Sequence, residues 1–454
     1  MYRTGELLDH EIMRDDRNFA LIVYDEEGHM ADSDLGDIIS MRHSVSTTDS
    51  SIIIGDVITQ TVTIEFALGV WGDNTGAAAL NLNRGKKIRI CYSFPRVAFA
   101  DKIPAGVFKV VDSTKKGKRL IVTAKDMFYG IDREYVSKLT YPTAIKNVLA
   151  EAAQQIGIPF NPPLEILETK ISGGYEYTYD ANDCCLMVRG EGEYIVPAKP
   201  VGLTLQQIIS KCAEAYGMSA YQDREGYLDF CAPLDDFAEL SHVSGTDEYE
   251  SQTYVIEPKR ADDPEKGKQK VVIAACKVIV NGEIVYQIDS SGTVDPGDVK
   301  YELVIEDPII PWAQAENLIL AVLDLYMDRV YTPASIYHRM GDPRLDIFDP
   351  VWCVEFDPDD EFKVFGIYIS SLDYSFDGGL ATTVNSSIGD TVGTVGEQSE
   401  SVDTRSAKSE QSQAVPRTGG PVSQKIERMQ AQISELAEEI ENIKKIILPK
   451  KEER

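Results

Sequence analysis

The sequence predicts a mainly β fold with an α+β insertion and a C-terminal coiled coil. Two regions rich in Val, Ile, Phe and Tyr flank two amphipathic helical patterns, and a strict heptad repeat follows near the end of the chain. The 454 residues leave room for about three domains. We expect a first β barrel domain over residues 1–138, an α+β domain over 139–240, a second β barrel domain with one helix over 241–388, a flexible linker over 389–422 and a coiled-coil helix over 423–449.

The first β-rich region contains five predicted strands, at residues 18–24, 61–68, 86–94, 106–111 and 118–126. In the second of them, Val62, Ile64 and Phe66 alternate with polar residues, which is the pattern of a strand buried on one face. A polar turn containing Gly117 separates the last two strands. This region therefore predicts one antiparallel barrel or sandwich.

Helical periodicity follows in two segments, and each is closed by a glycine. The apolar positions of the first are Ile145, Val148, Leu149, Ala152 and Ile156, before Gly157; those of the second are Leu205, Ile208, Ile209, Cys212 and Tyr216, before Gly217. Thr204 and Gln207 form a capping box in front of the second helix. A hairpin is expected next, turning at Arg224, Glu225 and Gly226.

Strands return over residues 271–286, where Asn281-Gly282 is a strong signal for a β-hairpin. A helix is expected after Pro311. Its inner face would carry Trp312, Ala315, Ile319, Val322, Leu323 and Tyr326. Residues 351–356 and 362–376 predict further strands of this second β-rich region.

The C-terminal heptad is preceded by a polar segment, from Gly389 to about Gly420, that is too poor in large apolar residues to form a core. The predicted oligomer interface consists of Ile426, Met429, Ile433, Leu436, Ile440, Ile443 and Ile447, with Glu439 and Lys444 placed to pair between chains. The mixed residues at the d positions leave two, three or four strands open. An amphipathic helix docked on the protein's own surface is the alternative.

The net charge excludes one class of function. Lys and Arg total 45 and Asp and Glu total 74, which gives a formal charge of −29 and argues against a nucleic-acid-binding protein. No apolar run approaches the ~18 residues of a membrane span, and no secretory signal is visible at the N-terminus. The seven cysteines are odd in number and irregularly spaced, and the adjacent pair Cys184-Cys185 fits neither a zinc nor a redox motif, so we expect free thiols.

No catalytic constellation is recognisable, so we expect no enzyme activity, no cofactor and no metal. The five histidines, His10, His29, His43, His242 and His338, stand in no known catalytic motif. An acidic cluster of Asp357, Asp359, Asp360 and Glu361 is read as a solvated turn, with a Ca²⁺ ion as the alternative. The basic run of Lys115, Lys116, Lys118 and Arg119 is read as a solvated hairpin tip, although a phosphate contact is conceivable.

Four stretches together resemble the hub proteins of phage tail tips and baseplates, a family that includes the N-terminal hub region of tail-associated lysins. They are SIIIGDVITQTVTIEFAL (51–68), the segment 103–142 with its G-x-F-x-V and I-V-T-A-x-D elements, the helix-then-hairpin unit 202–230, and MGDPRLDIFDPVWCVEF (340–356). In the last stretch Phe348 stands where the family commonly has Gly, so this turn is expected to differ. The matches span about residues 50 to 385.

The resemblance implies two tail-tube-like β barrels per chain, assembled as a homotrimeric ring that continues the tail tube. The implied partners are distal tail, tube or baseplate proteins, the tape measure protein, and a spike or tail-fibre protein. The implied location is the virion tail tip or baseplate, or a tailocin or other contractile injection particle, after synthesis in the bacterial cytoplasm. Family members often carry a C-terminal lytic enzyme, for which this chain leaves no room beyond its linker and coiled coil.

The acidity suggests a hypothesis about the ring. A bore lined with carboxylates would repel phosphates, so DNA would pass through without specific binding, whereas charge on the outside would only aid solubility. Two other functions remain open: a trimeric receptor-binding or adhesin protein of the tail tip, and a tail-associated cell-wall hydrolase.

Overall fold

The computed structural model describes most of the chain up to residue 387. The described residues are 19–47, 54–68, 79–94, 102–160, 167–170, 176–180, 185–188, 195–233, 237–242, 249–257, 261–262, 264–266, 270–280, 283–289, 299–306, 309, 326, 329–355 and 363–387. The chain divides into two units, residues 1–396 and 397–454. The second unit lies outside the described residues, as does the predicted linker, so both the linker and the coiled coil stay predictions.

The described residues are mainly β. The strands of the N-terminal part are β1 (Ala20–Asp25), β2 (Met30–Asp32), β3 (Ile38–Ser46), β4 (Thr59–Ala67), β5 (Lys87–Ser93), β6 (Ile103–Lys116) and β7 (Arg119–Lys125). All five strands predicted for this region are confirmed. In β4 the side chains of Val62, Ile64 and Phe66 are fully buried, as their alternation predicts.

Both predicted helices are present, with the predicted ends. Helix α2 spans Ile145–Ile156 and ends at Gly157, whose φ of +83° is the left-handed conformation that glycine adopts without strain. Helix α3 spans Leu205–Ala215, and the capping box between Thr204 and Gln207 forms at its start. The predicted hairpin follows as β13 (Ser219–Gln222) and β14 (Leu228–Cys231).

The middle of the chain carries several short strands. They are β8 (Thr143–Ala144), β9 (Leu167–Lys170), β10 (Glu176–Asp180), β11 (Cys185–Val188), β12 (Ile195–Val196), β15 (Ser241–His242), β16 (Tyr249–Glu250), β17 (Tyr254–Ile256) and β18 (Glu265–Lys266). Strands β9–β11 form a three-stranded antiparallel sheet, and β8 pairs with β12 directly before α2. The boundaries between the predicted domains stay predictions.

The remaining strands are β19 (Val271–Val280), β20 (Glu283–Asp289), β21 (Val299–Glu306), β22 (Val330–Tyr331), β23 (Ala334–His338), β24 (Pro350–Glu355), β25 (Lys363–Tyr368), β26 (Ser371–Phe376) and β27 (Leu380–Ser386). The predicted hairpin over 271–286 is confirmed by the antiparallel pairing of β19 with β20, although Asn281 and Gly282 themselves lie outside the described residues. The helix expected after Pro311 also lies outside them, except for Tyr326, which is helical and fully buried.

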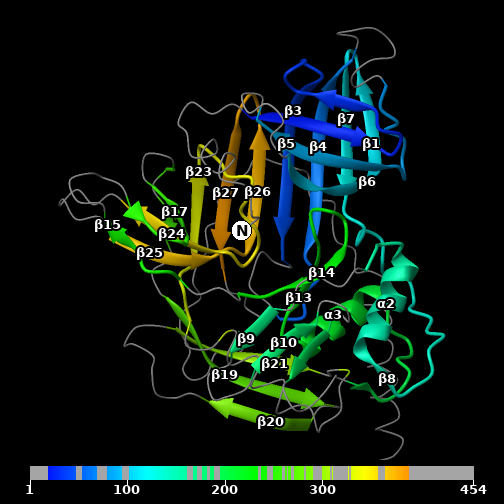
Figure 1. Ribbon diagram of the computed structural model, residues 1–454, viewed down its shortest axis with the longest axis vertical. Coiled ribbons are helices and arrows are strands. Elements are labelled where there is room, and N and C mark those ends of the chain that lie inside the picture. Colours follow the sequence, from blue (N-terminus) through cyan, green and yellow to red (C-terminus); the bar gives the residue numbers. More distant parts are fainter. Residues whose placement is uncertain are drawn as a thin grey trace, which may run out of the picture. The chain divides into compact units, whose positions relative to one another are not determined.

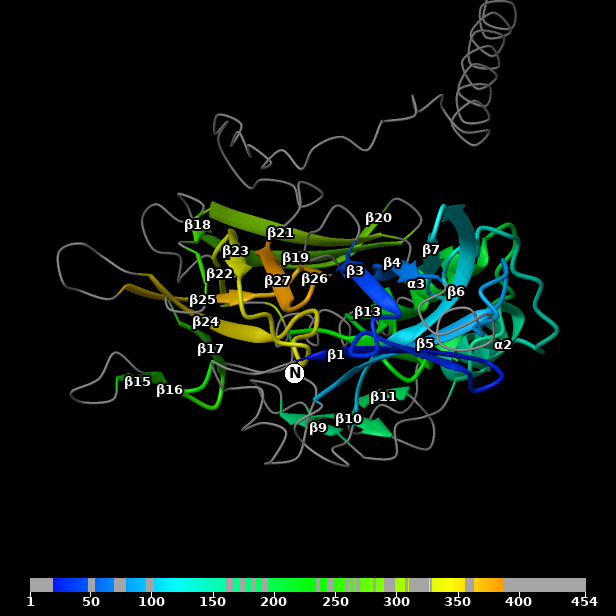
Figure 2. The same ribbon diagram turned by 90° about the horizontal axis from the view of Figure 1, so that it is seen from above.

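One sheet of eleven strands joins the two ends of this unit. Its order is β18-β23-β27-β26-β3-β4-β7-β6-β5-β1-β2, so strands from residues 20–125 and from 265–386 are hydrogen-bonded into a single surface (Figures 1 and 2). The two groups meet where β3 pairs antiparallel with β26, over six residue pairs from Ser46↔Ser371 to Met41↔Phe376. Among the described residues β2 and β18 each pair on one side only, so closure into barrels stays a prediction.

Two buried apolar cores lie within the unit. One packs β1–β7 together with β24–β27, and includes Ile64, Val351 and Leu372. The other surrounds α2 and α3 and extends to β19 and β21. Val45 and Ile347 pack against both cores, so the region between β3 and the loop that precedes β24 connects them. Among the described helices, none combines the length and apolar character needed to cross a bilayer.

Candidate functional site

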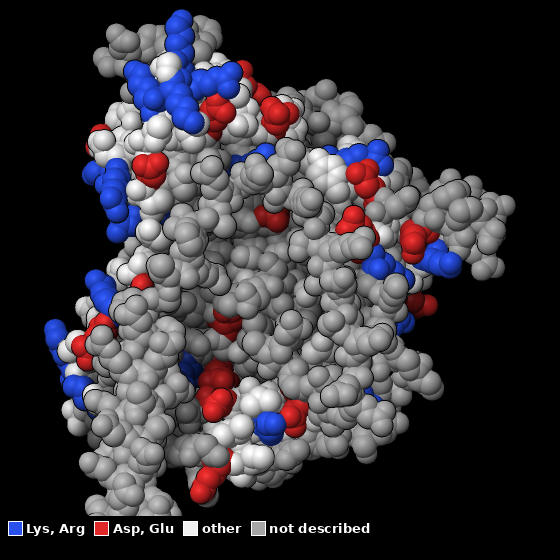
Figure 3. Space-filling view, turned by 180° about the vertical axis from the view of Figure 1, so that it is seen from behind, with Lys and Arg blue, Asp and Glu red and all other residues white. Residues whose placement is uncertain are grey.

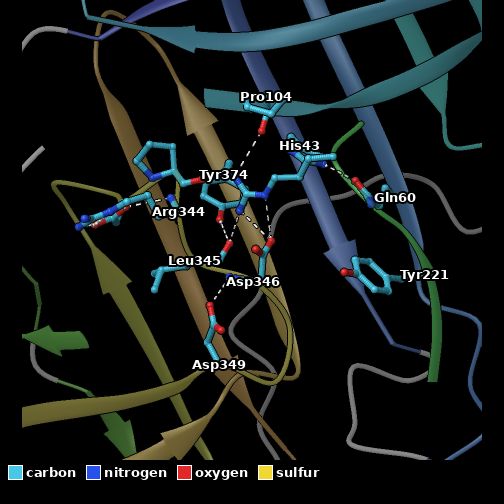
Figure 4. A network of polar contacts seen from close by, with 12 residues as sticks. His43, Gln60, Pro104, Tyr221, Arg344, Leu345, Asp346, Asp349 and Tyr374 are labelled. Atoms are coloured by element: carbon cyan, nitrogen blue, oxygen red, sulfur yellow. Dashed lines mark hydrogen bonds and ion pairs between the residues drawn. The ribbon is translucent and has the colours of Figure 1, made fainter. Parts of the chain in front are cut away.

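A polar junction lies where three distant parts of the chain meet. The turn of the β13–β14 hairpin reaches β6 on one side and the loop of residues 340–349 on the other (Figure 4). Asp223 builds this turn, because its Oδ1 accepts hydrogen bonds from the N–H groups of Glu225 (3.0 Å) and Tyr227 (2.7 Å). Gly226 has a φ of +95°, and a Cβ on it would lie 3.2 Å from Val107 of β6, so the turn approaches β6 closely.

Arg224, at the tip of this turn, connects all three parts. Its guanidinium donates to the backbone carbonyls of Pro104 (3.3 Å), Leu345 (2.8 Å) and Pro343. It also donates to Oδ1 of Asp346, from Nη2 at 2.7 Å and from Nε at 3.1 Å. Burial alone lowers the pKa of Arg224, but the Asp346 carboxylate outweighs it and holds the pKa above its usual value. The guanidinium is therefore a permanent charge that joins three segments.

The loop of residues 340–349 is itself rigidly built. Oδ1 of Asp342 accepts from the N–H (2.9 Å) and Nε (3.0 Å) of Arg344, and Oδ2 accepts from Nη2 (2.7 Å). Burial raises the pKa of Asp342, but the hydrogen bonds and the charge of Arg344 lower it by more. The pKa of Asp342 therefore lies below its usual value. Asp349 accepts from the N–H of Asp346 at 2.7 Å. The Pro343 and Leu345 carbonyls that Arg224 binds therefore belong to a loop that has hydrogen bonds of its own.

Phe348 has a left-handed backbone conformation, so the expectation that this turn differs from a glycine turn stays a prediction. Its φ is +67°, a conformation that costs a bulky residue about 1–2 kcal/mol and that glycine adopts freely. The N–H of Phe348 donates to the carbonyl of Ile369 (2.8 Å), and its ring is buried in the core around α2 and α3. Burial of the ring offsets the backbone strain.

Two glutamines complete the polar contacts. Gln60 of β4 donates from Nε2 to the carbonyl of Gln222 at 2.8 Å. Gln222 donates to the carbonyl of Val107 (2.6 Å) and accepts from the N–H of Met127 (2.8 Å). The N–H of Gln60 donates to Asp126, a carboxyl whose pKa burial raises to about 7. These side chains bind backbone groups that would otherwise be buried without partners.

His43 stands at the pairing of β3 with β26, beside this network. Its ring stacks on Tyr374 of β26 at 5.6 Å and meets Phe108 edge-on at 5.2 Å. Its Nε2 lies 3.2 Å from Oε1 of Gln60, and burial lowers its pKa to about 4, so the ring is neutral at neutral pH. Tyr374 donates from its hydroxyl to the carbonyl of Leu345 at 2.7 Å.

The polar groups of the junction mainly join segments of this chain to one another, and the space between them is small. Its cavity measures about 60 Å³, far below the roughly 300 Å³ at which pockets for small organic ligands begin. A larger hollow of about 390 Å³ lies beside β25, lined in part by Phe237, Arg329, Trp352 and Tyr368. There Arg329 donates to Pro233 and Tyr368, and the Trp352 indole donates to Ala238, so these polar groups serve the protein itself.

One cluster could hold a metal by its geometry, at the turn between β1 and β2. Ligand atoms of Asp25, Glu27 and His29 lie within 4.8 Å of one another. Asp25 is already used by the fold, however, since it accepts from the N–H groups of Glu27, His29 and Asn81, each at 2.9 Å. These bonds explain the cluster as a turn.

The residues singled out in the sequence have different outcomes. The nine predicted interface residues, Ile426, Met429, Ile433, Leu436, Glu439, Ile440, Ile443, Lys444 and Ile447, lie outside the described residues, as do the acidic cluster at 357–361 and the side chains of Cys184 and Cys185. Among the described residues, Cys91, Cys212, Cys231, Cys276 and Cys353 form no disulfide bond. The basic run 115–119 is an exposed hairpin tip, as predicted, and Lys and Arg side chains gather at the top of Figure 3.

Sequence reasoning missed the junction. It placed Arg224 in a turn and named His43 as one of five histidines, but it gave Gln60, Gln222 and Asp346 no role. The glycine beside Arg224 and the Asp-rich loop at 342–349 were visible, yet no periodicity links positions 122 residues apart. Buried polar partners of this kind leave no local signal in a single sequence.

The comparisons with known proteins gave structural likenesses alone. No protein-family model matches the chain, and no curated protein sequence matches it. Phage tail proteins are similar to it in structure. The 43 kDa tail protein of prophage MuSo2 from Shewanella oneidensis has 10% identity and a TM-score of 0.44, with 80% of this chain and 96% of that chain covered. The prophage tail protein gp18 from Listeria monocytogenes EGD-e has 12% identity and a TM-score of 0.43, with 80% and 94% covered. A p2 virion baseplate chain has 11% identity and a TM-score of 0.25, with 82% and 100% covered.

Proposed function

We propose that the chain is a structural hub of a phage or phage-like tail tip or baseplate. Three copies would form a ring that continues the tail tube, and the C-terminal heptads would associate as a coiled coil below it. The role is non-enzymatic, and the partners are distal tail or baseplate proteins, the tape measure protein and a spike or fibre.

The observation that carries the proposal is that the four stretches that resemble hub proteins meet at the junction. Each contributes side chains or carbonyls to the same network: Gln60 from 51–68; Pro104, Val107 and Asp126 from 103–142; Gln222 and Arg224 from 202–230; Pro343, Leu345 and Asp346 from 340–356. Each group depends on partners in another stretch. This mutual dependence supports one shared structural plan over four unrelated matches.

The contacts that hold the two β-rich regions together suit a protein that transmits force within a tail. The β3–β26 pairing and Arg224 hold residues from both β-rich regions against one hairpin, through backbone hydrogen bonds and a buried charge. A chain that transmits force between tube and tail tip needs its β-rich regions fixed to one another. The small junction cavity, with its side chains used in attachment, fits this role better than a substrate site.

The molar mass in solution tests the oligomer. We expect light scattering to give three times the chain mass for the full chain. A chain ending at Gly389 separates the two sources of association: a trimer places the interface in the β-rich regions, and a monomer places it in the coiled coil. A full chain that stays monomeric at high concentration would contradict the proposal.

A matched pair of variants tests the heptad itself. Ile433→Asp puts a charge at an a position, whereas Ser434→Asp puts the same charge at the neighbouring outward b position. We expect the first to lower the thermal stability of the trimer and the second to leave it unchanged. Equal behaviour of the two variants would instead support a helix that does not associate through this stripe.

A further inference from the structure

The junction contains a small cavity between β3, β5 and the tip of the β13–β14 hairpin, with a mainly apolar wall that also includes several polar side chains. Its volume is about 60 Å³, and its lining includes His43, Gln60, Tyr92, Arg224, Leu345 and Tyr374. A water molecule needs about 10–15 Å³ of such space, so a few can fit. What the cavity binds depends on which polar groups of the wall still lack a partner.

The hydrogen bonds of Gln60 determine which nitrogen of His43 carries the proton. Because Gln60 donates from Nε2 to the carbonyl of Gln222, its Oε1 is the atom that faces His43. Nε2 of His43 must then donate to that oxygen. In a neutral ring the other nitrogen, Nδ1, is an acceptor, and it is buried without a hydrogen-bond partner from the described chain.

Tyr92 of β5 supplies a second group of this kind. Its side chain is fully buried, and its hydroxyl has no hydrogen-bond partner from the described part of the chain. A phenol hydroxyl can both donate and accept. Two residues of the cavity wall, on two different strands, therefore carry one unpartnered acceptor and one unpartnered group that can donate or accept.

The charged groups of the wall exclude an ion. Arg224 has five N–H bonds, and five contacts with Pro104, Pro343, Leu345 and Asp346 use them. No donor of Arg224 remains for an anion. The carboxylate of Asp346 is paired with that same guanidinium, so the wall offers a cation little. The remaining ligand is a small neutral molecule that both donates and accepts.

We propose that this cavity is a binding site for ordered water, in which water donates to His43 Nδ1 and hydrogen-bonds to the Tyr92 hydroxyl, directly or through a second water. Buried polar groups beside a cavity large enough for water bind water in this way, because leaving them unpaired costs free energy. The water would link β3 to β5 beside the pairing with β26. This inference goes beyond the proposed function and does not depend on it.

A pair of tyrosine variants tests the proposal through the direction in which each variant shifts the urea midpoint. Tyr92→Phe removes a hydroxyl that water binds, so we expect a lower urea midpoint than in the wild type. Tyr326→Phe is the matched control, because that hydroxyl is also buried with no hydrogen-bond partner among the described residues but does not line the cavity. We expect its midpoint to stay equal or rise. A rise in both variants would overturn the proposal.

A crystal structure that resolves ordered water completes the test, since a direct bond between Tyr92 and His43 would also make Tyr92→Phe unfavourable. Density for water within about 3.2 Å of Nδ1 of His43, connected to the Tyr92 hydroxyl, is the expected result. A dry cavity, or a direct hydrogen bond between the two side chains, would overturn it.

Discussion

Two arginine–aspartate pairs lie on the loop of residues 340–349, and they connect different things. Arg344 and Asp342 are two residues apart, and their side chains are 7% and 0% exposed. Arg224 and Asp346 are 122 residues apart, and their side chains are 13% and 42% exposed. The first pair shapes the loop from within, whereas the second attaches a hairpin from elsewhere in the chain.

The difference in exposure predicts different effects of the two pairs on the free energy of unfolding. A carboxylate that is fully buried depends on its arginine, because no water can replace the lost partner. A carboxylate that is nearly half exposed can be hydrated when its arginine is removed. The local pair should therefore have the larger effect on unfolding, although the long-range pair holds the junction together.

The largest effect is expected for Arg344→Ala. It leaves Asp342 buried without its guanidinium, and we expect a loss of about 3–5 kcal/mol in the free energy of unfolding, measured by urea denaturation. The double variant Asp342→Ala/Arg344→Ala should recover part of this loss, since it removes the unpaired charge. A loss below about 1 kcal/mol for the single variant would contradict the comparison.

Arg224→Met should have the next largest effect. It removes the donors of three buried carbonyls but leaves Asp346 open to water, so we expect a loss of about 2–3 kcal/mol. Asp346→Ala, the control, should cost less, about 1–2 kcal/mol, because the carbonyl contacts of Arg224 survive although its buried guanidinium loses the carboxylate. Limited proteolysis should cut the turn 223–227 faster in Arg224→Met than in Asp346→Ala. Equal cleavage would show that the carbonyl contacts do not hold the hairpin.

A third carboxyl, Asp126, differs from both pairs in its partners. Backbone N–H groups of Gln60 and Phe128 donate to it, in place of an arginine. Burial raises its pKa to about 7 in the folded state, whereas Asp342, paired with Arg344, has a lowered pKa. A raised pKa means that the folded state holds a proton that the unfolded state has lost. The contribution of Asp126 is thus fully present below about pH 4 and is lost as the pH rises to about 7.

The contribution of Asp342 has the opposite sign: it is present above about pH 4 and is lost as the pH falls through the lowered pKa. Asp126→Asn should remove a fall of about 3 kcal/mol in the free energy of unfolding between pH 4 and pH 7, followed through the urea midpoint at each pH. Asp342→Asn, the contrasting variant, should leave that window unchanged and flatten the profile below about pH 4. Parallel profiles for wild type and Asp126→Asn would contradict this assignment.

The smallest effect is expected for Thr204→Ala, which removes a helix cap away from both arginine pairs. The capping box of α3 should contribute about 1 kcal/mol, measured by thermal or urea unfolding. Gln206→Ala, an exposed position in the same turn, serves as the control and should cost less than about 0.5 kcal/mol. Proteolysis of the hairpin turn should stay at the wild-type rate in both variants. Faster cleavage would show that α3 and the junction are coupled.

The sequence was informative where a structure depends on neighbours along the chain. The ends of α2 and α3, the capping box of Thr204 and the turn around Gly226 follow from local patterns, and all are confirmed. Phe348 stands where the hub proteins that the sequence resembles commonly have glycine. Its φ of +67° is a conformation that glycine adopts without strain.

Long-range pairing could not be predicted in the same way. Nothing in the periodicity of β3 indicates that Ser44 lies opposite Asp373, or that His43 stacks on Tyr374. The partner of a polar residue such as Arg224 depends on which surfaces meet after each region has folded. Patterns of two or 3.6 residues show which face is buried, but not what covers it.

Electron microscopy of the purified full-length chain tests the central claim most directly. The account predicts particles with threefold symmetry around a central bore, in which the β-rich regions form the wall. Carboxylates facing the bore would support passage of DNA, and a bore lined with Lys and Arg would reject that part. Single, asymmetric chains at concentrations well above those used for light scattering would contradict the account as a whole.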